Sequence, residues 1–182
     1  MCIRDSRDVV LDGLNVVEGG QTSTGSVLAW FKKIAGFENY ADLDAEASMI
    51  PPGCEGITSL DHFQGNRTPF TDPFSRGAMT GLSLKHSRAH LYRSLIESIC
   101  YGTDCVLEAM RDASFVPKSI VVAGGPAKSK LWLQCHADIS GIPFILTKVS
   151  DAPCLGSAIL AAVGAKLFPS IPDAVKSMVH VS

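Results

Sequence analysis

The chain has 182 residues, and its 46% hydrophobic and 19% charged content describes an ordinary globular protein that can bury a sizeable core. Its formal net charge of -2 disfavours a general binder of polyanions, so we expect no nucleic-acid partner. We expect no membrane partner either, because no apolar run has membrane-spanning length and the first residues carry no signal-peptide pattern.

The first half of the chain alternates turns with short elements. We expect a glycine- and hydroxyl-rich turn at 19–25, helices at 27–35 and 41–49, a strand at 57–60, a loop at 63–73 and a strand at 78–84. Gly36 is well placed to end the first helix, and Pro51-Pro52-Gly53 stops the second.

The second half follows a regular order of helices and strands. Ser87 is the expected N-cap of a long helix whose core-facing stripe includes Leu91, Leu95, Ile96, Ile99, Val106, Leu107 and Met110. After it we expect a strand at 120–123, a helix at 128–140 capped by Gly141, a strand at 143–147, a helix at 153–167 and a helix from 171. This alternation predicts an α/β layered domain.

Two polar residues of the long helix have an expected role. His90, near the first turn, is interpreted as a packing or hydrogen-bonding residue rather than a catalyst. Glu97 lies among apolar neighbours and is interpreted as a buried, paired carboxylate, with its partner left open.

The cysteines and histidines favour a structural role over a metal site. None of the six cysteines forms a Cys-x-x-Cys pair, and the five histidines include no His-Glu-x-x-His motif. Cys100 and Cys105 lie in an apolar helical pattern, where a buried thiol packs as a small hydrophobe. We therefore predict no metal ligands and a reducing, cytoplasmic setting.

The segment 151–165 is rich in small residues. Gly156, Ser157, Ala161, Gly164 and Ala165 would let this helix approach another backbone closely, and Asp151 or Ser150 would cap its N-terminus. Tight packing and a ligand-binding role both remain open for it.

The most informative segment is the loop after the strand at 120–123. A β-branched run ends in Gly124-Gly125 and then turns into a helix, which lets backbone amides approach a phosphate or nucleotide. Lys128-Ser129 follows Ala127, so the loop is not a Walker A motif, and Gly-x-Gly-x-x-Gly is absent. The residues alone leave two interpretations, a nucleotide loop or a tight strand-to-helix turn.

Several segments together resemble the FGGY carbohydrate kinases. The stretch 77–97 is similar to that family's C-terminal signature, and 65–77 is similar to its Gly-Glu-Arg-x-Pro…Asp-Pro…Arg-Gly stretch, with Asn66 in place of Glu. Residues 124–129 resemble its adenosine motif, 151–158 its Glu-Ala-x-x-Leu-Gly-Ala-Ala segment, and 18–26 a turn of ribulokinase-like members.

The resemblance implies an actin-like ATPase domain of the ribonuclease H-like type, with a mixed sheet flanked by helices. Such kinases transfer the γ-phosphoryl group of MgATP to a sugar or polyol in a cleft between two domains. By motif match, Gly25 would lie near the nucleotide, Gly124 and Gly125 against the adenosine, and Ser129 near the base. The turn at 18–26 favours a pentulose as substrate.

The resemblance also implies what lies elsewhere. The family's N-terminal domain supplies the first phosphate loop, most sugar contacts and the aspartate general base, so no catalytic residue is expected here. We interpret 9–182 as a C-terminal kinase domain truncated at both ends and 1–8 as junction residues. The oligomeric state stays open.

Three rival hypotheses remain. A non-enzymatic ATP-binding module of the actin or chaperone type would use a similar adenosine loop, but the signature at 77–97 disfavours it. A dinucleotide-binding Rossmann-like domain is weakened by the missing glycine fingerprint. The third hypothesis is a structural domain with no ligand.

Overall fold

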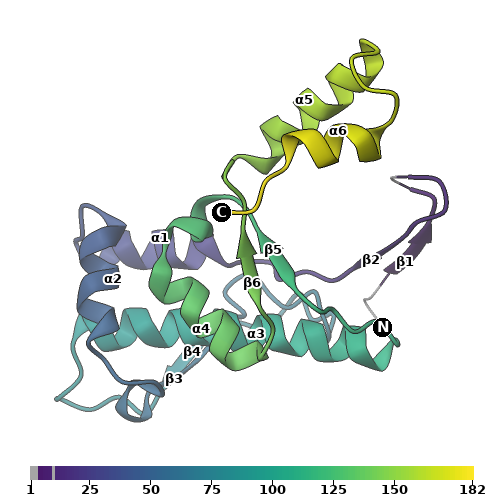
Figure 1. Ribbon diagram of the computed structural model, residues 1–182. Coiled ribbons are helices and arrows are strands. Elements are labelled where there is room, and N and C mark those ends of the chain that lie inside the picture. The colour runs from purple at the N-terminus through teal and green to yellow at the C-terminus, as the bar shows by residue number, and fades with distance from the viewer. Residues whose placement is uncertain (1–3, 10) are drawn as a thin grey trace.

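The computed structural model describes residues 4–9 and 11–182, and Figure 1 shows its elements in chain order. They are β1 (Arg4–Arg7), β2 (Asn15–Glu18), α1 (Gly25–Ile34), α2 (Tyr40–Ser48), the 3₁₀ turn η1 (Cys54–Gly56), β3 (Thr58–Leu60), β4 (Ala78–Thr80), α3 (Arg88–Asp112), β5 (Ile120–Val122), the 3₁₀ turn η2 (Gly125–Lys128), α4 (Lys130–Ser140), β6 (Phe144–Leu146), α5 (Ala152–Gly164) and α6 (Ile171–Met178).

The strands of the described residues pair two by two. β1–β2 and β3–β4 are antiparallel, whereas β5–β6 is parallel, with Val121 opposite Ile145. Parallel and antiparallel pairs both occur, as a mixed sheet requires, but here they form separate two-stranded sheets rather than one continuous sheet. α4 makes the crossover between β5 and β6, which is the usual connection of parallel strands.

The long helix α3 carries the core. Leu95, Ile96 and Ile99 have no exposed surface, and they pack with Leu43 of α2 and Phe31 of α1. Their spacing of three and four residues places them on one stripe of α3. The stripe predicted from the sequence is therefore confirmed, and α1, α2 and α4 are fixed against it.

Expected caps are confirmed at several helix ends. The Ser87 backbone N–H donates to Nδ1 of His90 at 3.1 Å, so His90 closes a capping box at the start of α3. Gly141 ends α4 with a left-handed φ of 65°, and the Asp151 carboxylate accepts from the Cys154 N–H at 3.2 Å. The thiol of Cys100 is buried as expected, whereas Cys105 is exposed, which corrects its expected place in the core.

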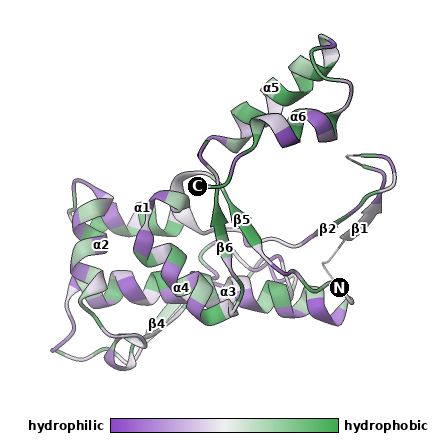
Figure 2. Cartoon of the chain, in the orientation of Figure 1, coloured by the Kyte–Doolittle hydropathy of each residue, from purple (hydrophilic) through white to green (hydrophobic). Residues whose placement is uncertain are grey.

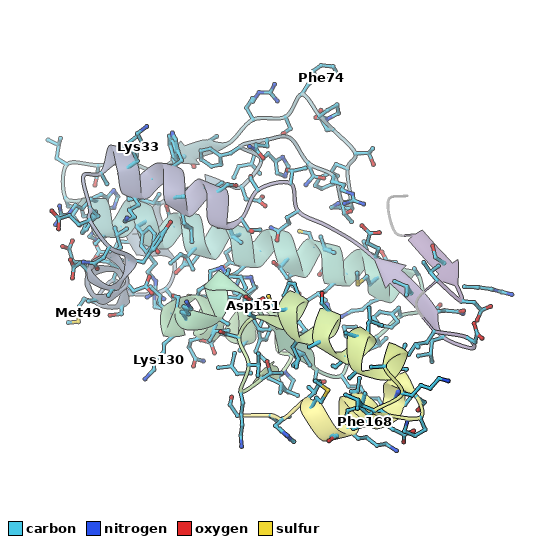
Figure 3. All side chains as sticks on the ribbon, turned by 90° about the horizontal axis from the view of Figure 1, so that it is seen from above. Lys33, Met49, Phe74, Lys130, Asp151 and Phe168 are labelled. Carbon is cyan, nitrogen blue, oxygen red and sulfur yellow. The ribbon has the colours of Figure 1, made fainter. Side chains whose placement is uncertain are left out.

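The strand expected at 78–84 is shorter than predicted and ends at Thr80. Gly81 follows with a φ of +80°, and a Cβ built there would lie 2.1 Å from the carbonyl oxygen of Gly56. Only glycine fits this close approach, and the left-handed backbone turns the chain out of the strand. Beyond β3, the loop that carries Phe74 projects away from the helices, on the side opposite α5 and α6 (Figure 3).

Tight packing, one of the two interpretations left open for the small residues of α5, is not found at its glycines. A Cβ added at Gly156 or Gly164 would meet no atom within 4 Å, and Leu160 is 60% exposed. Figure 2 shows apolar residues along most of this helix, which packs with α6 on the far side of β5–β6 from α1–α4 (Figure 1). The glycines of α5 therefore face open space, and among the residues of this helix only Ile159 is buried.

The N-terminal segment was expected to be a junction. Residues 1–3 lie outside the described residues, and Arg4–Arg7 forms a strand that pairs with Asn15–Glu18. The origin of residues 1–8 stays a prediction. Among the helices of the described residues, none combines the length and the apolar character that crossing a membrane requires.

Glu97 is buried and paired, as its apolar neighbours indicated. Its carboxylate accepts from Arg93 Nε at 2.8 Å and from the Gly53 N–H at 3.0 and 3.2 Å, and Arg93 also donates to the Ala47 carbonyl at 3.3 Å. Burial, together with the charge and hydrogen bond of Glu97, raises the pKa of the Cys54 thiol to about 12. Through these hydrogen bonds the Arg93–Glu97 pair ties the turn after α2 to α3.

We predict that Glu97→Ala lowers the free energy of unfolding by roughly 3–5 kcal/mol, because it leaves Arg93 buried without its partner. Urea denaturation followed by circular dichroism measures this loss. The double variant Arg93→Met/Glu97→Met should lose less, since no charge is then left unpaired. A Glu97→Ala loss below about 1 kcal/mol would contradict the assignment.

Candidate nucleotide pocket

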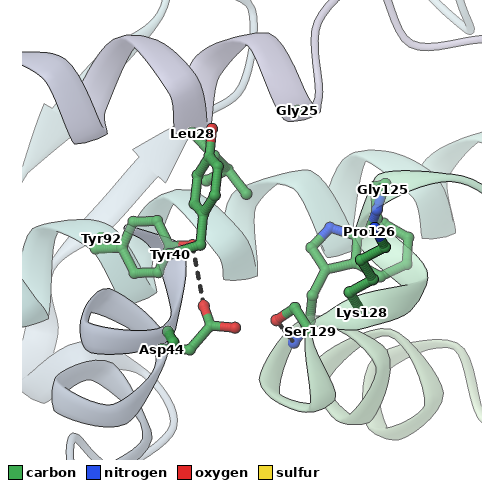
Figure 4. A pocket seen from close by; sticks show the side chains of 11 residues that line it. Gly25, Leu28, Tyr40, Asp44, Tyr92, Gly125, Pro126, Lys128 and Ser129 are labelled. Carbon is green, nitrogen blue, oxygen red and sulfur yellow. Dashed lines mark hydrogen bonds between the residues drawn. The ribbon is translucent and has the colours of Figure 1, made fainter. Parts of the chain in front are cut away.

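A pocket of about 440 Å³ opens between α1, α2 and the η2–α4 segment (Figure 4). Tyr40 and Asp44 of α2 and Tyr92 of α3 line one wall. Gly125 of η2 and Ser129 stand on the opposite wall, where Figure 4 shows them facing that aromatic side. The lining is mainly apolar with a few polar groups, which is typical of a small-molecule site.

The start of α1 forms a third side. Gly25 is the first residue of α1 and lines the pocket, and a Cβ added there would meet no protein atom within 4 Å. The turn before it is held in place, because the Thr22 hydroxyl donates to the Gly65 carbonyl at 2.6 Å and the Gly20 N–H donates to Thr68 Oγ1 at 3.3 Å. The start of α1 thus borders the pocket on a backbone that is held from outside it.

The loop after β5 begins with a backbone conformation that favours glycine. Gly124 has φ 89° and ψ −165°, and its N–H donates to the Ser150 carbonyl at 3.1 Å. Gly125 then begins η2, so the helix predicted from Lys128 begins only at Lys130. The reason is Ser129, whose extended backbone separates η2 from α4 and whose Oγ accepts from the Trp132 N–H at 3.1 Å as the N-cap.

The opposite wall carries a hydrogen bond of its own. Tyr92 donates its hydroxyl proton to Asp44 Oδ1 at 3.0 Å. Burial and the neighbouring Asp44 raise the pKa of Tyr92 well above its usual range, so this phenol stays a donor. Asp44 and Lys128 are the charged side chains among the described residues of the lining.

Three of the four residues singled out in the sequence therefore meet in one pocket. Gly25, Gly125 and Ser129 line it, and Gly124 directly precedes Gly125 without lining it. Their binding roles stay predictions. Sequence reasoning missed the wall made by α2 and α3, although Tyr40 and Asp44 share one face of a helix at a spacing of four residues.

Behind this pocket lies a buried histidine. The centroid of the His136 ring lies 3.6 Å from that of Trp132, a residue that lines the pocket. His136 is only 2% exposed. Burial lowers its pKa from 6.5 to about 4, so the imidazole is neutral at neutral pH. His136 Nδ1 lies 2.9 Å from the Cys100 sulfur, and Nε2 lies 3.2 Å from Thr103 Oγ1.

The profile of the FGGY family of carbohydrate kinases, C-terminal domain, matches residues 5–165. The chain belongs to the FGGY family. The match extends from β1 to the end of α5, and it includes all residues that line the pocket. The resemblance inferred from the separate motifs is thereby confirmed.

Individual relatives agree with this assignment. The chain is 32% identical to a ribulokinase of Mycolicibacterium smegmatis, over 91% of this chain and 31% of that protein. It superposes on a xylulose kinase of Rhodospirillum rubrum with a TM-score of 0.83 and 29% identity, over 99% of this chain and 36% of the other. A Plasmodium falciparum glycerol kinase, solved with ADP, has a TM-score of 0.77 and 23% identity, over 90% of this chain and 32% of the other.

These likenesses confirm the expected fold, the actin-like ATPase fold of FGGY sugar kinases. The chain spans about a third of the length of the relatives that it matches. It is therefore a C-terminal domain of the sugar-kinase type, and its relatives include kinases of pentuloses and of glycerol.

We predict that the fold loses stability as the pH falls from about 6.5 to 4, because the unfolded chain takes up a proton on His136 in this range and the folded chain does not. The pKa shift corresponds to a loss on the order of 3 kcal/mol. Urea denaturation at several pH values measures it, with His136→Gln as the reference that cannot titrate. A constant difference between the two proteins from pH 7 to pH 4.5 would contradict the prediction.

Proposed function

We propose that this chain is the nucleotide-binding part of a sugar kinase that uses MgATP. The observation that carries the proposal is the convergence of Gly25, Gly125 and Ser129 on one pocket. They come from two segments about a hundred positions apart in the sequence, 18–26 and 124–129, and each segment resembles a different motif of the family. A protein without a ligand has no need for this convergence.

The pocket supports a division of roles. Gly25 would admit the nucleotide at the start of α1, Gly124 and Gly125 would pass against the adenosine, and Ser129 would lie near the base. Space for this exists, because a Cβ at Gly25 or Gly125 would meet no protein atom within 4 Å. The exposed ring of Tyr40 gives a flat base an apolar surface for stacking.

Mg²⁺ would enter with the nucleotide. The described residues contain no group of three or more His, Cys, Asp or Glu side chains that could hold a metal ion. This fits Mg²⁺, which is commonly held by substrate phosphates, water and one or two carboxylates rather than by an all-protein cage. When bound, the ion neutralises charge on the transferred phosphoryl group.

The acceptor in this proposal is a sugar or polyol, and we favour a pentulose. The relatives include a ribulokinase and xylulose kinases, and the turn at 18–26 resembles ribulokinase-like members. The general base and most sugar contacts would come from an N-terminal domain, in keeping with a match to about a third of the relatives' length. We also propose that the protein works in the reducing cytoplasm. Cys54, Cys100 and Cys135 are buried free thiols, which is typical of that compartment.

We predict that Gly125→Val weakens binding of MgATP by about tenfold or more, because its side chain would fill space that the nucleotide needs. Isothermal titration calorimetry on the 182-residue chain measures the affinity. Gly164→Val is the matched control, because that glycine also has open space around its Cβ position but lies at the end of α5. Equal affinity in the two variants would argue against this pocket as the nucleotide site.

We also predict that the chain alone has no sugar-kinase activity. Phosphoryl transfer depends on positioning by both domains, and the pocket can hold only part of the reacting assembly. An assay of ADP release with MgATP and ribulose or xylulose measures turnover, with a full-length xylulose kinase as positive control. Turnover by the chain alone would show that its own residues include the general base.

A further inference from the structure

A chain of polar side chains crosses the protein beneath the pocket, in the order Cys100, His136, Thr103, Gln21 and Asp61. The successive distances are 2.9 Å from Cys100 Sγ to His136 Nδ1, 3.2 Å from Nε2 to Thr103 Oγ1, 2.8 Å from Oγ1 to Gln21 Oε1, and 2.8 Å from Gln21 Nε2 to Asp61 Oδ2. Cys100, His136 and Asp61 are buried.

Two members of this chain, His136 and Gln21, support opposite sides of the pocket. His136 belongs to α4, and its ring contacts that of Trp132 at a tilt of 37°, next to the wall that holds Ser129. Gln21 begins the turn that leads into α1 at Gly25. Between them, α3 contributes Thr103, so one hydrogen-bonded path joins α4, α3 and the turn.

The direction of the hydrogen bonds can be derived from the groups themselves. Gln21 Nε2 donates to Asp61 and to the Ile99 carbonyl, at 2.8 and 3.0 Å, so Gln21 Oε1 is left to accept. The single Thr103 hydroxyl proton has two acceptors in reach, Gln21 Oε1 at 2.8 Å and the Ile99 carbonyl at 3.1 Å. Because the carbonyl already accepts from Gln21 Nε2, the proton goes to the nearer Gln21 Oε1. His136 Nε2 then carries the proton and donates to Thr103, and Nδ1 accepts from the Cys100 thiol.

The other neutral tautomer satisfies fewer groups. A proton on Nδ1 would go to the Trp132 carbonyl at 2.9 Å, and Nε2 would take the hydroxyl proton of Thr103. Gln21 Oε1 and the Cys100 thiol would then both lose their partners. In the Nε2-protonated form the Trp132 carbonyl faces the unprotonated Nδ1 at 2.9 Å without a proton between them, so one contact between two acceptors offsets part of this gain. The carbonyl itself is not left unpaired, because it lies within α4, where carbonyls accept from the N–H four residues on.

Gly102 supports this interpretation independently. It lies inside α3, where glycine is less favourable than alanine by about 1 kcal/mol. A Cβ there would lie 2.3 Å from Gln21 Nε2 and 2.4 Å from Asp61 Oδ2. The absence of a side chain at this position therefore lets Gln21 and Asp61 meet against α3.

We propose that Gln21, Thr103 and His136 are positioning residues of the nucleotide pocket, joined in a one-way hydrogen-bond chain that fixes the turn before Gly25 relative to α4. None of the three lines the pocket, so they act through Gly25, Ser129 and Trp132. The inference rests on the proposed function, because it assigns a role in binding the nucleotide.

Thr103→Val and Thr103→Ser form the matched pair that tests the effect on binding. Valine keeps the volume of threonine and loses the hydroxyl, whereas serine keeps the hydroxyl. We expect Thr103→Val to weaken MgATP binding about fivefold, the effect of one lost neutral hydrogen bond, and Thr103→Ser to bind within twofold of the wild type. Isothermal titration calorimetry, at a temperature at which both variants are folded, measures the two affinities. Equal affinities would overturn the proposal.

The tautomer of His136 gives a readout that does not require a nucleotide. Nitrogen-15 NMR of the imidazole should show the proton on Nε2 in the wild type. A proton on Nδ1 in the wild type would overturn the chain. Failure of the wild type to bind MgATP, with the tautomer as expected, would instead refute the proposed function and leave the hydrogen-bond chain intact.

Discussion

The buried stripe of α3 is the constraint on which the arrangement of the other elements depends. Leu95, Ile96 and Ile99 are fully buried, and α1, α2 and α4 pack around them. The same helix presents Tyr92 to the pocket and Arg93 and Glu97 to the turn after α2. Burial of the apolar stripe drives this packing, and each buried polar group of α3 then needs a partner from a neighbouring element.

The pocket combines an aromatic wall with two sides made from backbone and small residues. Gly25 and Gly125 leave space, and Ser129 uses its side chain to cap α4 rather than to fill the site. The glycine sides depend on where their backbone stands, since glycine has no side chain that could adjust. The contact between Thr22 and Gly65 holds the turn before Gly25 from outside the pocket, whereas the hydrogen bond from Tyr92 to Asp44 holds the aromatic wall from within.

Much of the fold could be predicted from local pattern. The caps at Ser87 and Gly141 and the apolar stripe of α3 depend on residues within a few positions of one another, and their predictions are confirmed. The errors have tertiary causes. The strand from Ala78 ends early because Gly81 meets the backbone of Gly56, and Cys105 is exposed where its apolar helical pattern placed it in the core.

For the candidate site too, one part could be predicted from the sequence and another part could not. Glycine and serine motifs in the sequence pointed to Gly25, Gly124, Gly125 and Ser129, because backbone access to a ligand leaves a local signature. The sequence by itself thus determined the family and the order of helices and strands from α1 onward, but not the strands β1 and β2. Only the tertiary structure decided that these loops share one pocket with Tyr92 and Asp44, and that Gln21 meets Asp61 beside Gly102. Those contacts join residues tens of positions apart, and their geometry is set by how the helices pack rather than by any local pattern.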